Sequence, residues 1–89
     1  MKHCLTVAGS DCSGGAGIQA DLKTFGALGC YGMSVITSVV AENTAKVISM
    51  ENMPQNIVAD QLDAIFCDIR VDAVKTGMLP NCDIIRTAA

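Results

Sequence analysis

The chain has 89 residues, 51% of them hydrophobic and 3% aromatic, with a formal net charge of −3. The negative charge and the lack of a Lys/Arg cluster exclude a nucleic-acid surface and an anionic-membrane surface. No apolar run reaches the roughly 18–20 residues that cross a bilayer, and the N-terminus does not resemble a signal peptide, so we expect a cytoplasmic protein with no membrane partner. Because domains usually have about 100–150 residues, we expect residues 1–89 to be part of one larger domain.

The first predicted elements are a short strand and a helix joined by a glycine-rich turn. The apolar run 4–8 predicts the strand, and the turn 9–21 follows with four glycines in nine residues. A helix is expected from about Ala16, because Ile18, Leu22, Phe25 and Leu28 recur at helical spacing, and Gly29 is its expected C-terminal cap. Glycine backbone and a helix N-terminus together suit the close approach of a ligand.

Asp21 has an unusual position on this helix. On a helical wheel it falls between Leu28 and Phe25, inside the apolar arc. Two interpretations remain open at this point. Asp21 lies at the edge of the stripe and reaches water or a cap, or it points from the first turns of the helix into a ligand site.

The middle of the chain predicts two further strands and a second helix. The β-branched run 33–41 predicts a strand covered on both faces inside a parallel sheet, ending in the polar cluster 42–44, which is either a ligand-binding strand end or a turn. Residues 47–50 predict a short strand. Pro54 suits the first turn of a helix whose buried stripe is expected to be Val58, Leu62, Ile65 and Ile69, with Asp60, Asp63 and Asp68 on its solvated face.

The last predicted elements are a strand over 71–78 and the beginning of a third helix near Pro80. Met78 lies just beyond the turn residue Gly77 and is either a core residue or a contact to a flat ring. The resulting β-α-β-β-α-β series leaves a sheet edge and apolar faces uncovered, which indicates truncation or dependence on a partner.

Cysteine usage predicts reduced thiols. The five cysteines are odd in number, widely spaced and without a Cys-x-x-Cys pair, so they match neither a zinc pattern nor a disulfide framework. Cys4 and Cys67 are expected to be small buried hydrophobes, whereas Cys12 lies in the glycine-rich turn, where it could line a pocket.

Two common nucleotide-binding patterns fit the turn poorly. The segment 9–16 lacks the lysine and the hydroxyl residue that a Walker phosphate loop requires. Residues 15–20 match Gly-x-Gly-x-x-Ala of the Rossmann fingerprint, with Glu42 in the place of its acidic ribose ligand. In that fingerprint, however, the first glycine follows the strand almost at once, whereas here six residues intervene between Ala8 and Gly15.

Four segments together resemble the hydroxymethylpyrimidine/phosphomethylpyrimidine kinases of thiamine biosynthesis: 7–11, the specific run 13–24, 31–37 and 75–78. This family belongs to the ribokinase-like superfamily, and the chain resembles the N-terminal third of its members. The resemblance implies an α/β fold with a mostly parallel sheet and flanking helices, of which only the N-terminal β-α-β-β-α-β portion is present.

The resemblance also implies an activity. Members transfer the γ-phosphoryl group of ATP, with Mg²⁺, to 4-amino-5-hydroxymethyl-2-methylpyrimidine and then to its monophosphate. The implied substrate-binding positions are Gly9 and Ala16 at the turn under the substrate, Asp21 near its hydroxymethyl end, Val40 and Glu42 along the ring edge, and Met78 against a ring face. A homo-oligomer is implied for the full-length protein.

Two departures from the family pattern matter. The family usually has glutamine where this chain has Glu42, and a carboxylate only accepts hydrogen bonds whereas an amide also donates. The family's Gly-Thr-Gly-Cys segment, which stabilises the transferring phosphoryl group, is absent, as is most of the ATP site. We therefore expect no catalytic residue and no metal ligand in these 89 residues, and little or no turnover by them alone.

Two other functions remain open. A pyridoxine or pyridoxal kinase would also phosphorylate a hydroxymethyl group on a flat heterocycle. A non-catalytic pyrimidine-binding remnant or module would hold the ring without reacting it.

Overall fold

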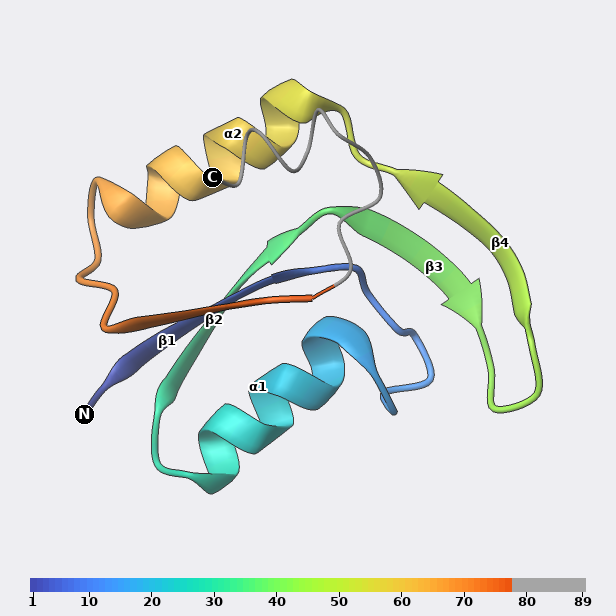
Figure 1. The fold of residues 1–89 in the computed structure, drawn as a ribbon, viewed down its shortest axis with the longest axis horizontal. Coiled ribbons are helices and arrows are strands. Elements are labelled where there is room, and N and C mark those ends of the chain that lie inside the picture. The colour runs from blue at the N-terminus through green and yellow to red at the C-terminus, as the bar shows by residue number, and fades with distance from the viewer. Residues whose placement is uncertain (78–89) are drawn as a thin grey trace.

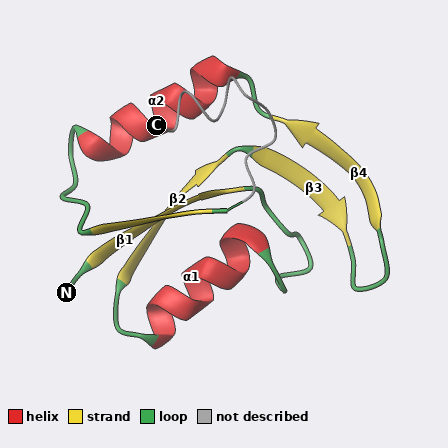
Figure 2. Cartoon of the chain, in the orientation of Figure 1, coloured by secondary structure: helices red, strands yellow, loops and turns green. Residues whose placement is uncertain are grey.

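The structure is a computed structural model, and it describes residues 1–77. Its elements follow the order β-α-β-β-β-α-β, which is the predicted β-α-β-β-α-β series with one additional strand between the two helices (Figures 1 and 2). In chain order they are β1 (His3–Ala8), α1 (Gly17–Ala27), β2 (Tyr31–Ile36), β3 (Ser38–Glu42), β4 (Val47–Asn52), α2 (Gln55–Phe66) and β5 (Ala73–Thr76). The third helix expected near Pro80 lies outside the described residues.

A three-stranded parallel sheet with the order β2-β1-β5 forms the centre. Because side chains alternate along a strand, β1 sends Leu5 and Val7 into the core beneath α2, where Val58 is fully buried. On the other face, Thr6 lies against α1, where it donates to Asp21. The two helices therefore cover opposite faces of the sheet (Figure 1).

The buried stripe of the second helix is confirmed in position. Val58 is fully buried, and Leu62 and Ile65 pack against the core. Ile69 packs there too, although the helix ends at Phe66. The aspartates at positions 60, 63 and 68 are exposed as expected.

The expectation of one continuous strand over 33–41 is wrong. The run divides at Thr37 into β2, which pairs with β1, and β3, which pairs antiparallel with β4. The cause lies in the partner strand: β1 ends at Ala8, where the chain enters the glycine-rich turn, so the segment after Thr37 has no parallel strand beside it. β3 is also not covered on both faces, since Val39 is 49% exposed. It bends away with β4 as a hairpin (Figure 2).

The expected burial of the cysteines is only partly correct. Cys4, Cys12, Cys30 and Cys67 are free thiols, as predicted, and Cys82 lies outside the described residues. Cys4 is half-buried, but Cys67 is exposed, because it follows the last turn of α2 two positions beyond Ile65 and faces away from the stripe. No helix within residues 1–77 is long and apolar enough to cross a membrane.

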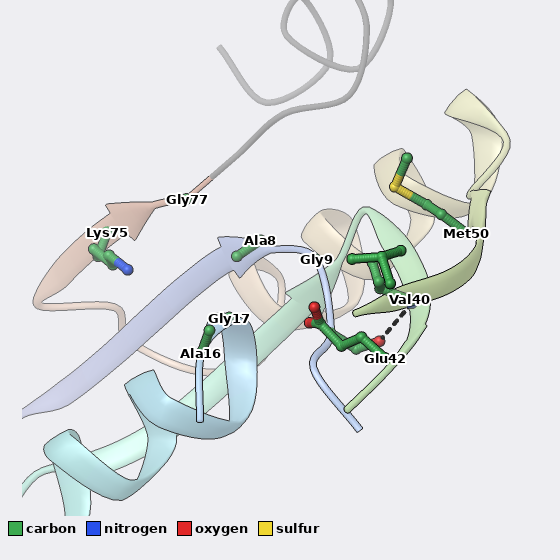
Figure 3. A pocket seen from close by; sticks show the side chains of 11 residues that line it. Ala8, Gly9, Ala16, Gly17, Val40, Glu42, Met50, Lys75 and Gly77 are labelled. Carbon is green, nitrogen blue, oxygen red and sulfur yellow. Dashed lines mark hydrogen bonds between the residues drawn. The ribbon is translucent and has the colours of Figure 1, made fainter. Parts of the chain in front are cut away.

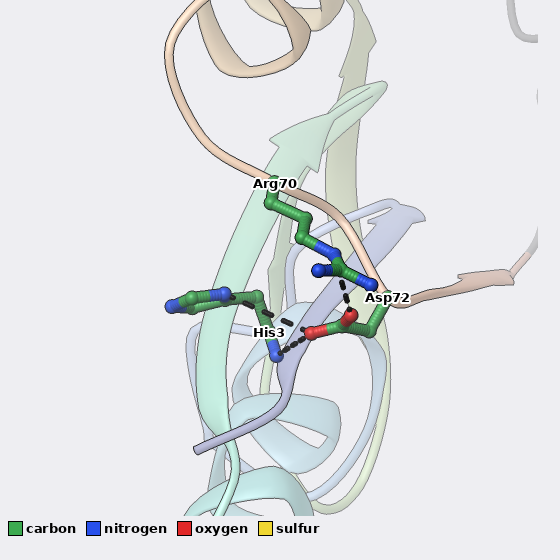
Figure 4. Close-up of polar contacts among 3 residues, drawn as sticks. All are labelled: His3, Arg70 and Asp72. Carbon is green, nitrogen blue, oxygen red and sulfur yellow. Dashed lines mark hydrogen bonds and ion pairs between the residues drawn. The ribbon is translucent and has the colours of Figure 1, made fainter.

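Asp72 joins β1 to β5 at the amino end of the sheet. Its carboxylate accepts a 2.8 Å hydrogen bond from the backbone N–H of His3 and lies 3.3 Å from Nε of Arg70 (Figure 4). The hydrogen bond from His3 is the largest influence on the pKa of Asp72, which lies below its usual range. The contact fixes the start of β5, so the other end of β5 is held beside the glycine-rich turn.

Gln61 ties α2 to the end of β2. Its Oε1 accepts from the backbone N–H of Ile36 and its Nε2 donates to the carbonyl of the same residue, both at 3.0 Å. The amide thus takes the place that a neighbouring strand would occupy.

We expect Gln61→Leu to lower the free energy of unfolding by about 1–2 kcal/mol, because it leaves two partly buried backbone groups unpaired. Urea unfolding followed by circular dichroism measures this, and Gln55→Leu at the exposed start of α2 is the control; equal midpoints for the two variants would contradict it.

Candidate functional site

A cavity of about 440 Å³ opens at the carboxyl ends of β1 and β5, between the glycine-rich turn and the β3–β4 hairpin (Figure 3). This is where open α/β sheets bind their ligands. Its walls are mostly apolar, and the polar side chains in them come from Ser10, Glu42 and Lys75. The other lining residues are Ala8, Gly9, Ala16, Gly17, Val40, Val47, Met50 and Gly77.

The structure brings four of the six predicted site residues to this cavity. Gly9 and Ala16 line it from the turn, and Val40 and Glu42 line it from β3. Asp21 does not line it, and Met78 lies outside the described residues. Their predicted roles in binding a substrate remain predictions, but the common location of the four is a property of the fold.

Asp11 holds the glycine-rich turn in shape. Its buried carboxylate accepts hydrogen bonds from the backbone N–H and the hydroxyl of Ser13, at 2.9 and 2.6 Å, and from the backbone N–H of Gly15 at 3.1 Å. The side chain of Gln19 in turn accepts from the N–H of Asp11. The hydrogen bond from the Ser13 hydroxyl is the main cause that lowers the pKa of Asp11, so this carboxylate is ionised at neutral pH.

Two glycines let the turn close tightly. Gly17 has φ +58°. The N–H of Ile18, the next residue, donates a 3.0 Å hydrogen bond to the carbonyl of Gly9 and closes the turn. A Cβ on Gly17 would overlap that carbonyl oxygen, and one on Gly9 would lie 2.7 Å from the hydroxyl of Ser38. The glycines of the predicted turn therefore serve close backbone packing at the floor of the cavity.

Neither interpretation of Asp21 describes its position fully. Its side chain is 14% exposed and lies between α1 and the sheet, where it accepts from Thr6 Oγ1 at 2.6 Å and from Lys75 Nζ at 2.8 Å. Burial acts most strongly and raises the pKa of Asp21, but the hydrogen bonds from Lys75 and Thr6 and the charge of Lys75 together outweigh it and lower the pKa. Asp21 thus reaches the cavity only through Lys75.

Glu42 is the acidic group of the cavity. It is half-buried at the end of β3, and burial, the nearby charge of Asp11 and a hydrogen bond with Asp11 all raise the pKa of its carboxyl group. The residue after it behaves differently: Asn43 Oδ1 accepts from the N–H groups of Ala45 and Lys46. Of the polar cluster 42–44, Glu42 alone therefore faces the cavity, and Asn43 shapes the hairpin turn.

Several lining residues escaped prediction from the sequence. Val47 and Met50 reach the cavity because β4 folds back antiparallel on β3. Lys75 could have been suspected, since it is the one charged residue near the carboxyl end of the strand run 71–78. Within residues 1–77 no group of three or more His, Cys, Asp or Glu side chains is arranged to hold a metal ion.

Comparison with known proteins agrees with this fold. Residues 11–89 match the family model described as phosphomethylpyrimidine kinase. The chain is 56% identical over 87 residues to the hydroxymethylpyrimidine/phosphomethylpyrimidine kinase of Salmonella typhimurium, covering 98% of this chain and 33% of that protein. The crystal structure of a phosphomethylpyrimidine kinase from Clostridium difficile superposes with a TM-score of 0.96 at 52% identity, over 99% of this chain and 38% of that one.

Vitamin kinases of a second kind share the fold. The ADP complex of Bacillus subtilis pyridoxal kinase superposes with a TM-score of 0.91 at 47% identity, over 99% of this chain and 35% of that one. The fold is therefore the ribokinase-like α/β fold of small-molecule kinases, as the sequence predicted. Within that class, the chain belongs to the phosphomethylpyrimidine kinase family, and it spans about one third of the length of its relatives.

Proposed function

We propose that the full-length protein containing this chain transfers the γ-phosphoryl group of ATP to 4-amino-5-hydroxymethyl-2-methylpyrimidine and to its monophosphate, in thiamine diphosphate biosynthesis. The observation that carries the proposal is the cavity itself: an apolar slot with one carboxyl group, built from the turn and strand ends that the family resemblance selects. In this arrangement the chain supplies much of the pyrimidine site.

The cavity suits a flat ring with a polar edge. Val40 and Met50 offer aliphatic and thioether surfaces for ring faces, and Glu42 offers a hydrogen-bonding group beside them (Figure 3). Gly9 and Ala16 add little bulk to the floor of the site. Met78 completes the ring contact in this proposal, from the segment that follows Gly77.

Glu42 recognises the ring through one shared proton. An aminopyrimidine presents a ring nitrogen and a 4-amino group, so its partner has to donate one hydrogen bond and accept another. The carboxyl group of Glu42 does both when it is protonated, whereas an ionised Glu42 accepts two hydrogen bonds from a protonated ring, one from the ring N–H and one from the 4-amino group. The raised pKa of Glu42, caused first by burial and then by Asp11, favours the protonated carboxyl group of these two forms.

ATP and Mg²⁺ are the expected co-substrate and cation. Staphylococcus aureus pyridoxal kinase was solved with AMP-PCP and with ADP, and it shares the fold at 43% identity. ATP would supply the phosphoryl group to the hydroxymethyl oxygen, whose proton is lost as the new P–O bond forms and ADP departs. Residues 1–77 hold the acceptor ring and its environment in this scheme, and we expect them to have little turnover without the rest of the site.

The proposal for Glu42 predicts a pH-dependent affinity. Since the complex holds one proton more than the ionised free groups, the affinity should fall as pH rises above the pKa values of Glu42 and the ring, by up to about tenfold per pH unit. Glu42→Gln should flatten this dependence, because an amide donates and accepts at every pH. Calorimetric titration of the full-length protein and of the variant with the pyrimidine, between pH 5 and 8, measures both affinities. The same dependence of affinity on pH in the two proteins would contradict recognition through a shared proton.

Pyridoxal kinase activity is the second candidate, favoured by the pyridoxal kinase structures that share this fold. A substrate panel with the full-length protein distinguishes the two. We expect the pyrimidine to have the higher kcat/KM, and a higher value for pyridoxal would reverse the assignment. Binding of the pyrimidine without phosphorylation would instead support the remnant or module. A single domain containing these residues and a homo-oligomer of the full-length protein also remain predictions.

A further inference from the structure

The first residues of the glycine-rich turn, beyond the end of β1, lie beside the start of β3. At the end of β1, the carbonyl of Ala8 accepts a 2.9 Å hydrogen bond from the N–H of Thr37, between β2 and β3. Beyond it, the N–H of Ser10 still donates to the carbonyl of Ser38 at 2.9 Å. The pairing therefore crosses the end of β1 and reaches into the turn.

Two side chains then replace the main-chain acceptors of a ladder. Ser10 Oγ accepts from the N–H of Val40 at 3.2 Å, and Cys12 Sγ accepts from the N–H of Glu42 at 3.4 Å. Cys12 Sγ also donates to the carbonyl of Glu42 at 3.0 Å. Alternate residues of the turn, Ser10 and Cys12, thus bind alternate residues of β3. These two β3 residues, Val40 and Glu42, line the cavity.

We propose that Cys12 is a positioning residue for the pyrimidine site, whose thiol fixes the backbone of Glu42 and thereby the place of its carboxyl group at the ring edge. This inference rests on the proposed function. Cys12 is exposed and does not line the cavity, so it acts on a bound ring through Glu42. Ser10 has the same relation to Val40, but it also lines the cavity, and its substitution would change a surface of the site directly.

A serine at position 12 can keep both hydrogen bonds, since a hydroxyl donates and accepts as a thiol does. An alanine keeps neither. The Glu42 end of β3 borders the hairpin turn, where the register with β4 shifts between Ala41 and Glu42, and the thiol holds both the N–H and the carbonyl of Glu42 at that point. Loss of the thiol therefore leaves the end of β3 free to shift while the rest of the sheet is retained.

The test is steady-state kinetics of the full-length protein with the pyrimidine and ATP. We expect Cys12→Ala to raise the KM for the pyrimidine about three- to tenfold, with the KM for ATP unchanged and kcat within twofold, and Cys12→Ser to restore the wild-type value. Cys67→Ala is the matched control, because Cys67 is another exposed free thiol, remote from the cavity lining. Equal KM values for Cys12→Ala and wild type would overturn the inference.

Two further outcomes separate this inference from others. If the wild-type protein does not phosphorylate the pyrimidine, the proposed function fails, whatever Cys12 does. If it does, but Cys12→Ala lowers kcat and raises the KM for ATP as much as the KM for the pyrimidine, and Cys12→Ser does not restore them, the residue has only a general structural role and the inference is wrong. The pH profile gives a second readout: with Cys12→Ala, the difference in affinity between wild-type Glu42 and the Glu42→Gln substitution should shrink, because the carboxyl group is no longer held at the ring edge.

Discussion

Replacing Gly17 with alanine is expected to lower the free energy of unfolding by about 3 kcal/mol and to impair the turn that lines the cavity. Gly17 has φ +58°, which costs a residue with a Cβ about 1 kcal/mol or more. The added Cβ would also overlap the carbonyl oxygen of Gly9, whose hydrogen bond with Ile18 closes the turn. Both penalties act on backbone, so a side-chain rearrangement does not relieve them.

Gly26, in the same helix, provides a matched control with the opposite sign. It has no positive φ, and a Cβ built on it meets no atom within 4 Å. Gly26→Ala should therefore stabilise the protein by about 0.5–1 kcal/mol through the higher helix propensity of alanine. Urea unfolding of both variants measures the two effects, and a Gly17→Ala protein as stable as wild type would contradict the assigned strain.

The order of elements could be predicted because hydrophobic periodicity is local. The stripe on α2 and the β-branched run of β2 and β3 are visible in a few consecutive residues. The division at Thr37 could not be predicted in this way. It follows from the end of β1, which lies in a different part of the chain. No residue within 33–41 marks the division.

The site was predictable to a similar extent and for the same reason. Gly9, Ala16, Val40 and Glu42 lie in segments whose own residues indicate a strand end or a ligand-binding turn. Met50 reaches the cavity only because β4 pairs antiparallel with β3, and Lys75 lines it from β5, which pairs with the distant strand β1. A helical wheel identified Asp21 as unusual, but the lysine and the threonine that explain it lie on other elements.

Asp21 links helix α1, the sheet and the cavity, so its loss should have a large effect on stability. Asp21→Ala removes the acceptor of the fully buried Thr6 hydroxyl and the partner of Lys75. We expect the free energy of unfolding to fall by about 2–3 kcal/mol, because a buried hydroxyl and one end of a charge-assisted hydrogen bond lose their partners. Asp21→Asn should recover part of this, since its amide oxygen still accepts from Thr6 but no charge faces Lys75.

The same carboxylate predicts the acid limb of the stability curve. The pKa of Asp21 is lowered in the folded protein, so its contribution is fully present above the unfolded-state pKa of about 3.9 and is lost as pH falls through the folded-state value. The wild-type protein should therefore lose its advantage over Asp21→Asn as pH falls from about 5 toward 2. Urea unfolding at a series of pH values measures the difference between the two proteins. A constant difference across that range would mean that Asp21 is not ionised against Lys75 in the folded protein.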